Sequence, residues 1–426
     1  MRAITTNRRR WYDRVVHRSG VILLLALHAC TPDAHDASAS AGGSTTRSET
    51  TIASTETSTS SVASTTSTSS ADTSSADTSS AGTSSTGTST GESTGGDTPP
   101  SYTPRQNVRY VSPAGDDAQD GMTIATAWHR VDAHIEAIPE DTEVVFLEGI
   151  HDGYTTEIYS SYGDRPLLPP HITLRAESYR GATIVGPGTP DGDTGGNAFT
   201  IEAVGGNVTR DLEIWGLVLT GWMDQYGNGV VSVHGDVDGL RIVGNDFHGN
   251  GSGSLLDHTI YLSGGETQAT APRNLAILHN DVDEPGGNGA FVHVYIGPGE
   301  QFAPHDWVAA DNVVRGTQTW GFILDPNFVA PANIEIHDND VRLVASAAIV
   351  DFWYGDATGK NGVDDTCVVH HNLFVNDGDG NVVKRQAVST GSPHAPVLHD
   401  NRYWSSTGGI VLDGIEAGDG DVIGPP

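Results

Sequence analysis

The chain has few of the residues and motifs that identify common classes of enzyme. Its 426 residues include two cysteines, Cys30 and Cys367, and no paired Cys motif. It also has no P-loop, no dinucleotide-binding fingerprint and no HExxH zinc motif. We therefore have no motif-based reason to expect nucleotide-dependent catalysis or a zinc site of the Cys or HExxH type.

Basic residues are scarce. The chain has 22 Lys and Arg against 54 Asp and Glu, a formal net charge of −32. Fifteen of the basic residues lie in 102–426, so this region is strongly acidic. An acidic surface repels nucleic acid, which we do not expect as a partner. It also repels polyanionic glycans unless a cation or a local basic site intervenes.

Long apolar runs are missing as well. The run from Val21 to Leu27 is far shorter than the roughly 20 residues that span a bilayer. It follows an Arg-rich start and precedes Leu27-His28-Ala29-Cys30, so residues 1–30 resemble a bacterial lipoprotein signal, although His28 departs from the usual pattern. The resemblance implies a lipid on Cys30 and a protein at the bacterial cell surface or outer membrane. The alternative is an ordinary secretory signal and a secreted protein.

Residues 31–101 are dominated by Ser, Thr, Ala and Gly with scattered acids. Such a segment cannot bury enough apolar surface to offset the entropy lost on ordering, which predicts a disordered linker. The predicted organisation is a signal over 1–30, a linker over 31–101 and one folded domain over 102–426. We expect a monomer whose only contact with a membrane is the N-terminal lipid.

A hydrophobic alternation followed by Asn recurs through the folded region at steps of 27 to 35 residues. The Asn positions are Asn245, Asn280, Asn312, Asn339, Asn372 and Asn401. The residues three and five positions earlier are mostly apolar and share one face of a strand, as Ile242 and Ile336 illustrate. This pattern predicts stacked coils of a solenoid with one continuous core. We expect each Asn to adopt the left-handed backbone of a tight corner and to bond to the next Asn in a ladder.

The start of the folded region adds a second pattern. Tyr110 to Asp117 and Asp120-Gly121 look like the opening of many extracellular β-helix proteins. Residues 127–138 follow, with Trp128, Val131, Ile135 and Ile138 on one helical face. Together with the repeat, these segments resemble the pectin-lyase-like superfamily over roughly residues 107–415. The resemblance implies an all-β fold, a right-handed single-stranded parallel β-helix with an N-terminal capping helix. This fold carries many activities, so function must come from the site.

The strand after each Asn holds the candidate site residues. If its apolar residues point inward, the outward column is Ser232, Tyr261, His293, Asp325, Asp351 and Lys384. Beside this column are His258, Trp353, Tyr354 and Arg385. Acids, bases and hydroxyls flanked by aromatic rings suit a sugar site, so a polysaccharide is the expected substrate or ligand.

Two reactions fit this column. Asp325 and Asp351 on neighbouring coils would form the carboxylate pair of a glycoside hydrolase. Alternatively, Lys384 or Arg385 would remove a proton next to a uronate carboxylate, with Tyr261 and His293 assisting, as in a polysaccharide lyase. A third possibility is a non-catalytic module that binds glycans or a cell surface.

Other residues raise the question of metals. Asp116, Asp117 and Asp120 form one acidic cluster and Asp377 and Asp379 another, and both would suit Ca²⁺ or would simply be solvated turns. Successive coils also carry a column of imidazoles, His337, His370 and His399, which either binds a transition metal or stacks on a solvated face. Cys367 falls in an apolar column and is expected to be a buried, inert thiol.

Overall fold

A computed structural model of the chain describes residues 98–152, 156–159, 168–188, 196–203, 207–223, 229–284, 289–296, 300–324, 332–352, 365–385 and 395–426, with the backbone alone for 156–159. All of these belong to one unit, residues 90–426. The predicted signal, its lipidation site Cys30 and nearly all of the predicted linker lie outside the described residues. No helix in the described part of the chain is long and apolar enough to cross a membrane.

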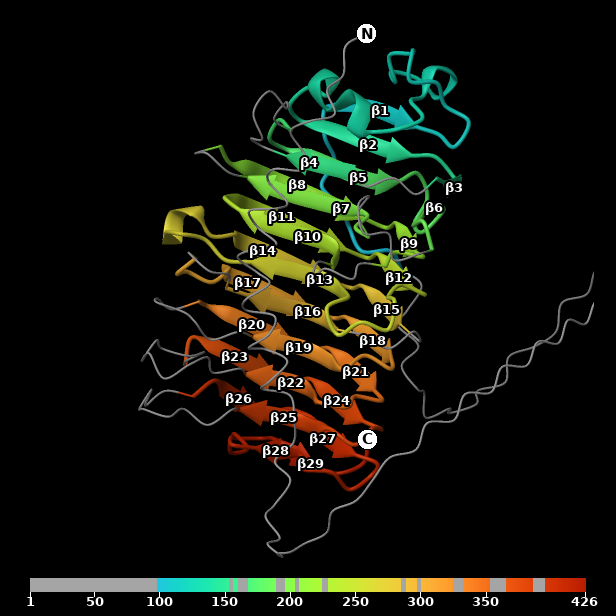
Figure 1. Ribbon diagram of the computed structural model, residues 1–426. Coiled ribbons are helices and arrows are strands. Elements are labelled where there is room, and N and C mark those ends of the chain that lie inside the picture. Colours follow the sequence, from blue (N-terminus) through green and yellow to red (C-terminus); the bar gives the residue numbers. More distant parts are fainter. Residues whose placement is uncertain are drawn as a thin grey trace, which may run out of the picture. The chain divides into compact units, whose positions relative to one another are not determined.

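The described strands form three sheets in which every pairing is parallel (Figure 1). Sheet A contains β1 (Asn107–Val111), β2 (Thr142–Phe146), β5 (Ile172–Ala176), β8 (Thr209–Trp215), β11 (Val237–Val243), β14 (Arg273–Leu278), β17 (His305–Ala310), β20 (Ile334–His337), β23 (Cys367–His370) and β26 (Val397–His399). Sheet B contains β3 (Gly149–His151), β6 (Ala182–Val185), β9 (Val218–Thr220), β12 (Asp246–His248), β15 (Asp281–Glu284), β18 (Val313–Gly316), β21 (Asp340–Leu343), β24 (Leu373–Asn376), β27 (Arg402–Ser405) and β29 (Val422–Ile423).

Sheet C completes each coil. It contains β4 (Thr156–Tyr159), β7 (Phe199–Ala203), β10 (Gly229–Gly235), β13 (His258–Ser263), β16 (Ala290–Tyr295), β19 (Trp320–Leu324), β22 (Ala348–Phe352), β25 (Asn381–Arg385) and β28 (Leu412–Asp413). In each coil the chain passes through sheets A, B and C in turn, and each strand pairs with the equivalent strands of the neighbouring coils. The predicted fold, an all-β parallel β-helix, is confirmed.

The core lies between the three sheets. The apolar columns before each Asn point into it, and Ile242, Ile277 and Ile336 are at most 1% exposed. The residues two positions after each Asn, such as Phe247 and Phe374, belong to sheet B, and their side chains are fully buried in the core. Cys367 is a buried free thiol, as its column predicted. No coil could bury these side chains alone, so stacking supplies the core.

The Asn ladder runs along the corner between sheets A and B. The backbone N–H and Nδ2 of each Asn both donate to Oδ1 of the next, at 2.9–3.2 Å, from Asn245 to Asn401. The ladder starts at the backbone N–H of Leu217 and ends on Asp421, which accepts from Asn401. These bonds satisfy buried polar groups that would otherwise destabilise the corner.

The left-handed backbone of this corner belongs to a different residue than expected. None of the ladder Asn residues has positive φ, so that expectation was wrong. The residue before each Asn has it instead, namely Gly244, His279, Asp311, Asp338, His371 and Asp400. Gly, Asp and His tolerate this region better than most residues, which explains their recurrence there. The turn is complete before the Asn, whose amide therefore points into the stack.

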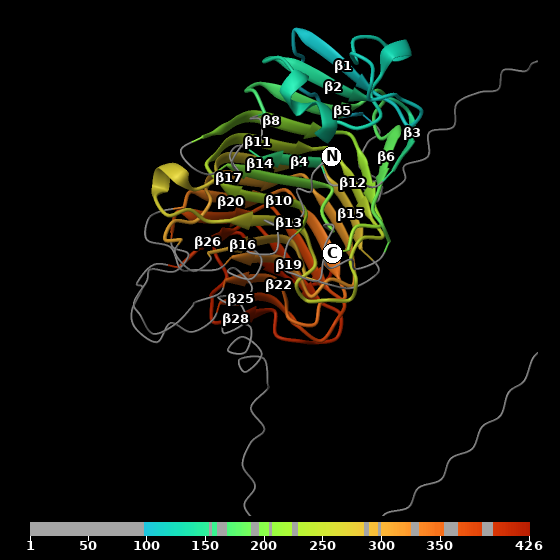
Figure 2. The ribbon, with the colours of Figure 1, turned by 45° about the horizontal axis from the view of Figure 1, so that its top comes forward.

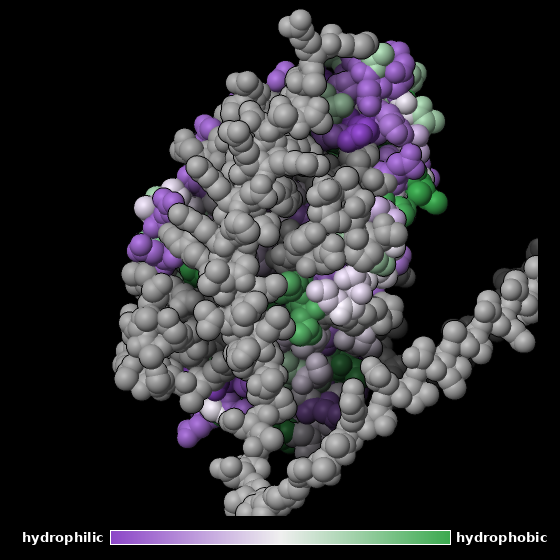
Figure 3. Space-filling model, viewed as in Figure 1, coloured by the Kyte–Doolittle hydropathy of each residue, from purple (hydrophilic) through white to green (hydrophobic). Residues whose placement is uncertain are grey.

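The cap at the N-terminal end is shorter than expected. The predicted helix over 127–138 is the six-residue 3₁₀ helix η2 (Asp132–Ala137), preceded by η1 (Ile124–Thr126). Ile138 is extended because Pro139 follows it, and this ends the helix early. A third 3₁₀ helix, η3 (Gln268–Thr270), precedes β14. Figure 2 shows the cap beside β1 and β2, and the described surface at this end is largely hydrophilic (Figure 3).

Residues 98–106 form an N-terminal strap across the outer face of sheet A. The carbonyl of Pro100 accepts a hydrogen bond from Trp215 Nε1 on β8 at 2.9 Å. The N–H of Thr103 donates to Glu213 at 2.7 Å, and the N–H of Arg105 donates to Glu143 on β2 at 3.0 Å. Packing thus begins slightly before residue 102, the predicted start of the domain.

Candidate functional site on the outer face of sheet C

The structure places the predicted outward column on sheet C, with one residue that differs from the prediction. Tyr261, His293, Ile323, Asp351 and Lys384 are successive Cα partners. Ile323 therefore occupies the position that the sequence analysis gave to Asp325. The error is a shift of two residues in β19, and it arose because loop lengths differ between coils. Asp325, like Trp353 and Tyr354, lies outside the described residues.

A cluster of five rings occupies one part of this face. We call His234, His258, Tyr261, His293 and Tyr295 the ring cluster. Its ring centroids lie 4.3 Å apart for His258 and His293, 5.4 Å for Tyr261 and His293, 5.6 Å for His234 and Tyr261, and 5.9 Å for His293 and Tyr295. Sequence reasoning missed His234 and Tyr295. They lie two residues after Ser232 and His293 in the predicted column, so strand periodicity would have found them.

Hydrogen bonds fix the proton positions on two of these rings. The N–H of Ala290 donates to His258 Nδ1 at 2.9 Å, so the neutral His258 ring carries its proton on Nε2. That nitrogen lies 2.8 Å from His293 Nδ1 and donates to it. His293 then carries its proton on Nε2, which is buried and has no hydrogen-bond partner among the residues that the structure describes.

The imidazoles of the ring cluster are uncharged at neutral pH. Burial lowers the pKa of His293 to about 3 and that of His234 to about 4. Burial, and then the neighbouring His293, lowers the pKa of His258 well below its ordinary value. Desolvation disfavours the cationic form of an imidazole, so the rings present N–H donors and ring faces rather than charge.

A charged end lies further along the same face. We give this name to Asp351 on β22 and to Lys384 and Arg385 on β25, although Arg385 ends its strand as the Cα partner of the buried Phe352 and so alternates with Lys384. Asp351 is only 1% exposed and accepts a hydrogen bond from Trp320 Nε1 at 3.3 Å. Lys384 is its Cα partner on the next coil and is partly buried. The chain contains two lysines, Lys360 and Lys384, and Lys384 is the one that the structure describes.

The four predicted catalytic residues that the structure describes, Tyr261, His293, Asp351 and Lys384, do not converge on one bond. Adjacent strands lie about 4.8 Å apart, which places Tyr261 and Lys384, four coils apart, roughly 19 Å from each other. Tyr261 and His293 are neighbours, as are Asp351 and Lys384, and Ile323 separates the two pairs. The structure therefore divides the predicted site into the ring cluster and the charged end.

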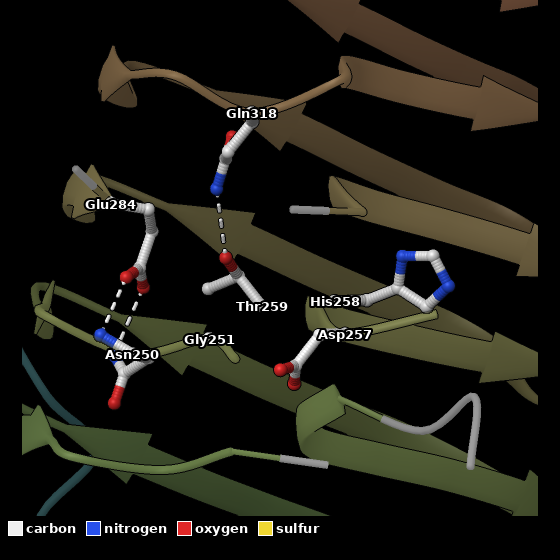
Figure 4. A pocket seen from close by; sticks show the side chains of 7 residues that line it. All are labelled: Asn250, Gly251, Asp257, His258, Thr259, Glu284 and Gln318. Atoms are coloured by element: carbon white, nitrogen blue, oxygen red, sulfur yellow. Dashed lines mark hydrogen bonds between the residues drawn. The ribbon is translucent and has the colours of Figure 1, made fainter. Parts of the chain in front are cut away.

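A small polar cavity adjoins the ring cluster where sheet B passes into sheet C. Its lining is Asn250, Gly251, Asp257, His258, Thr259, Glu284 and Gln318 (Figure 4), and it has room for roughly one water molecule. Glu284 accepts two hydrogen bonds from Asn250, at 2.7 and 2.9 Å. Burial nevertheless raises the pKa of Glu284 to about 7. Sequence reasoning missed this group because Glu284 lies outside the repeated phrase.

The acidic turns use their oxygens within their own loops. Asp116 accepts from the N–H of Ala118, Asp117 from those of His129 and Arg130, and Asp120 from that of Met122. These bonds lower the pKa of Asp116 and Asp120. Among the described residues, which include Asp377 and Asp379, no group of three or more acids, imidazoles or thiols is arranged to hold a metal ion.

The imidazole column on sheet A forms a stack. The rings of His337, His370 and His399 lie 5.0 and 4.8 Å apart and within 5° of parallel. Each has an acidic hydrogen-bond partner, such as Glu335 for His370 at 2.9 Å. Parallel rings do not point their nitrogens at a shared centre, so this geometry favours stacking over metal binding.

Comparison with known proteins gives a likeness of fold. Neither a protein-family model nor a curated protein sequence matches the chain. A GH136 lacto-N-biosidase from Eubacterium ramulus shares 10% identity at a TM-score of 0.39, over 74% of this chain and 68% of that one. An iota-carrageenase of family GH82 from A. fortis shares 15% at 0.40, over 68% and 62%. The pectate lyase Pel9A shares 12% at 0.29, over 74% and 77%.

Proposed function

We propose that this protein acts on an extracellular polysaccharide and cleaves it by β-elimination next to a uronate, at the charged end of sheet C. The observation that carries the proposal is the position of Lys384. It lies on the outer face of a strongly acidic domain, is followed in the chain by Arg385, and has Asp351 and Asp413 as its Cα partners on the two neighbouring coils. A local basic pair in an acidic domain is what an anionic sugar requires.

Each residue of the charged end has a role in this reaction. Arg385 binds the uronate carboxylate, and Lys384 in its neutral form removes the proton from the carbon next to that carboxylate. The electron pair left on carbon forms a double bond as the glycosidic C–O bond breaks. The leaving oxygen takes a proton, and the products are a new sugar hydroxyl and an unsaturated uronate. Asp351, buried beside Lys384, orients the amine.

The hydrolytic alternative has weaker support. Its carboxylate pair required Asp325 and Asp351 in one column on neighbouring coils, and Ile323 occupies that position instead. In the described part of the column the carboxylates are Asp351 and Asp413, which lie two coils apart with Lys384 between them, whereas the predicted pair lay on neighbouring coils.

The test is incubation of the protein with uncharged, uronate-containing and sulfated polysaccharides, with added calcium and with a chelator. Ultraviolet absorbance reports the unsaturated uronate, and a reducing-end assay reports all cleavage. We expect absorbance from a uronate-containing glycan and none with Lys384→Met. Reducing ends without absorbance would establish hydrolysis. Binding without any product would establish a glycan-binding module.

We also propose that the domain is attached to the bacterial surface by a lipid on Cys30. The support is the Arg-rich start, the short apolar run and the Leu27-to-Cys30 sequence. The protein should partition into detergent, and Cys30→Ser should abolish this. Mass spectrometry that finds cleavage elsewhere would refute the proposal and favour a secreted protein.

A further inference from the structure

The ring cluster is separate from the reacting groups that we assigned to the charged end. Its central ring, His293, lies two coils from Asp351 and three from Lys384. It cannot touch the atoms that Lys384 would deprotonate, because each coil adds about 4.8 Å. A second role for this cluster therefore has to be found in its own geometry.

The cluster holds one buried donor that lacks an acceptor. The chain of bonds from the Ala290 N–H through His258 to His293 fixes the last proton on His293 Nε2, and that atom is buried without a partner. A buried N–H without an acceptor is unfavourable, because it has lost its hydrogen bonds to water and gained none in the protein. A ligand oxygen that accepted this hydrogen bond would satisfy the donor, and the free energy of binding would become more favourable.

The surroundings of this donor disfavour a charged ligand. The rings that contact His293 are His258 and Tyr261 on β13 and Tyr295 on β16, and His234 on β10 contacts Tyr261 from the other side. None of them is cationic at neutral pH, since burial keeps the imidazoles uncharged. Glu202 on β7 is the Cα partner of His234 and adds an acidic group to this end of the face. An anionic sugar would meet no counterion here.

We propose that the ring cluster is a subsite for an uncharged sugar unit, in which His293 Nε2–H donates to a sugar oxygen and the Tyr261 and Tyr295 rings contact the sugar ring. His258 is the positioning residue that holds His293 in the donating tautomer. The inference rests on the proposed function in one respect, that the ligand is a carbohydrate. It implies a substrate in which uncharged units accompany the uronate that reacts at Lys384.

The first experiment measures binding to the full-length protein. Calorimetry is carried out with uncharged oligosaccharides of glucose, galactose, mannose and xylose, and with oligogalacturonate. We expect at least one uncharged oligosaccharide to bind and His293→Phe to weaken its binding about tenfold, the loss expected for one hydrogen bond to a buried donor. His399→Phe, the same change in the stack on sheet A, should leave binding unchanged. Equal affinity of wild type and His293→Phe, or binding of oligogalacturonate alone, would overturn the proposal.

The second experiment tests the role of His258 with a signal that a purely structural role would not change. In ¹⁵N-histidine-labelled protein, His293 should remain neutral and protonated on Nε2 between pH 5 and pH 8, and its N–H signal should shift when the oligosaccharide is added. His258→Phe should leave a folded protein in which His293 shows a mixture of tautomers. A single Nε2–H tautomer in that variant would overturn the assignment of His258.

Lys384→Met separates this proposal from the proposed reaction. It should abolish cleavage and leave the binding of uncharged oligosaccharide unchanged. If wild type cleaves nothing but binds the uncharged sugar through His293, the reaction is refuted and the subsite stands. If it cleaves a uronate glycan and His293→Phe has no effect on binding, the subsite is refuted and the reaction stands.

Discussion

The corner between sheets A and B and the outer face of sheet C are built from the same coils, yet they differ in every respect that matters for function. At the corner, six successive coils place the same residue, Asn, in the same hydrogen bonds. On the face, successive coils place Tyr261, His293, Ile323, Asp351 and Lys384. Every coil must turn in the same way, so each corner position has the same physical requirement. The outer face has no such requirement, and its residues are free to differ.

The contrast also separates stability from activity. The ladder Asn side chains are buried and bond to one another. The face residues include a buried donor without an acceptor and a buried carboxylate beside a lysine. Substitutions at the corner should therefore lower the free energy of unfolding, and substitutions on the face should change binding or catalysis.

The largest expected effect is on the face. Lys384→Met should lower kcat/KM by about 10²–10⁴-fold, the usual contribution of a general base, and should change the free energy of unfolding by less than about 0.5 kcal/mol. Initial rates and urea unfolding measure both quantities. A variant that retains more than about a tenth of the activity would remove Lys384 from the mechanism.

In the core beside the corner, Ile336→Ala should lower the free energy of unfolding by about 2–5 kcal/mol, because it leaves a cavity between stacked coils. Val344→Ala removes a side chain that is 51% exposed and should cost less than about 0.5 kcal/mol. Denaturant unfolding measures both variants. Similar losses for the two would contradict the assignment of the core.

Within the ladder, Asn312→Ala removes the acceptor of two bonds from Asn280, each 3.0 Å long. We expect a loss of about 2–4 kcal/mol with unchanged activity per folded molecule. Asn107→Ala removes an exposed bond to Glu140 and serves as the control, with a loss below about 0.5 kcal/mol. A ladder that tolerates the change would show that the stacked apolar columns hold the corner without it.

These outcomes mark what the sequence could predict. The columns of Ile336 and Asn312 were predictable, because a requirement repeated in every coil leaves a period in the sequence. The position of Asp325 was not, since the length of each loop before sheet C sets its register and no period encodes it. The left-handed residue was assigned one position too late, although Asp and His recur before the ladder Asn. The bond between His258 and His293 depends on side-chain directions that spacing does not give.

A pH-dependent effect concerns Glu284, between the two regions. Its folded pKa of about 7 lies above that of an unfolded Glu, so the protonated form stabilises the fold. This stabilisation is complete below about pH 4.5 and is lost as pH rises through 7, by up to about 3 kcal/mol. The lowered pKa values of His234 and His293 act in the opposite direction, so the measurement is the difference between wild type and Glu284→Gln from pH 5 to 8. A difference independent of pH would contradict the assignment.

The N-terminal strap determines where force enters the domain. Pro100 and Thr103 are bonded to β8 and Arg105 to β2 before the chain turns into β1. A pull on residues that precede the strap, such as drag on a surface-attached protein, would first load these contacts on sheet A, several coils away from the C-terminal strands. The first coils and their cap would be shielded until the strap detached. The strap would therefore detach before the strands of sheet C separated, because a few hydrogen bonds hold it and whole strand pairings hold the sheet.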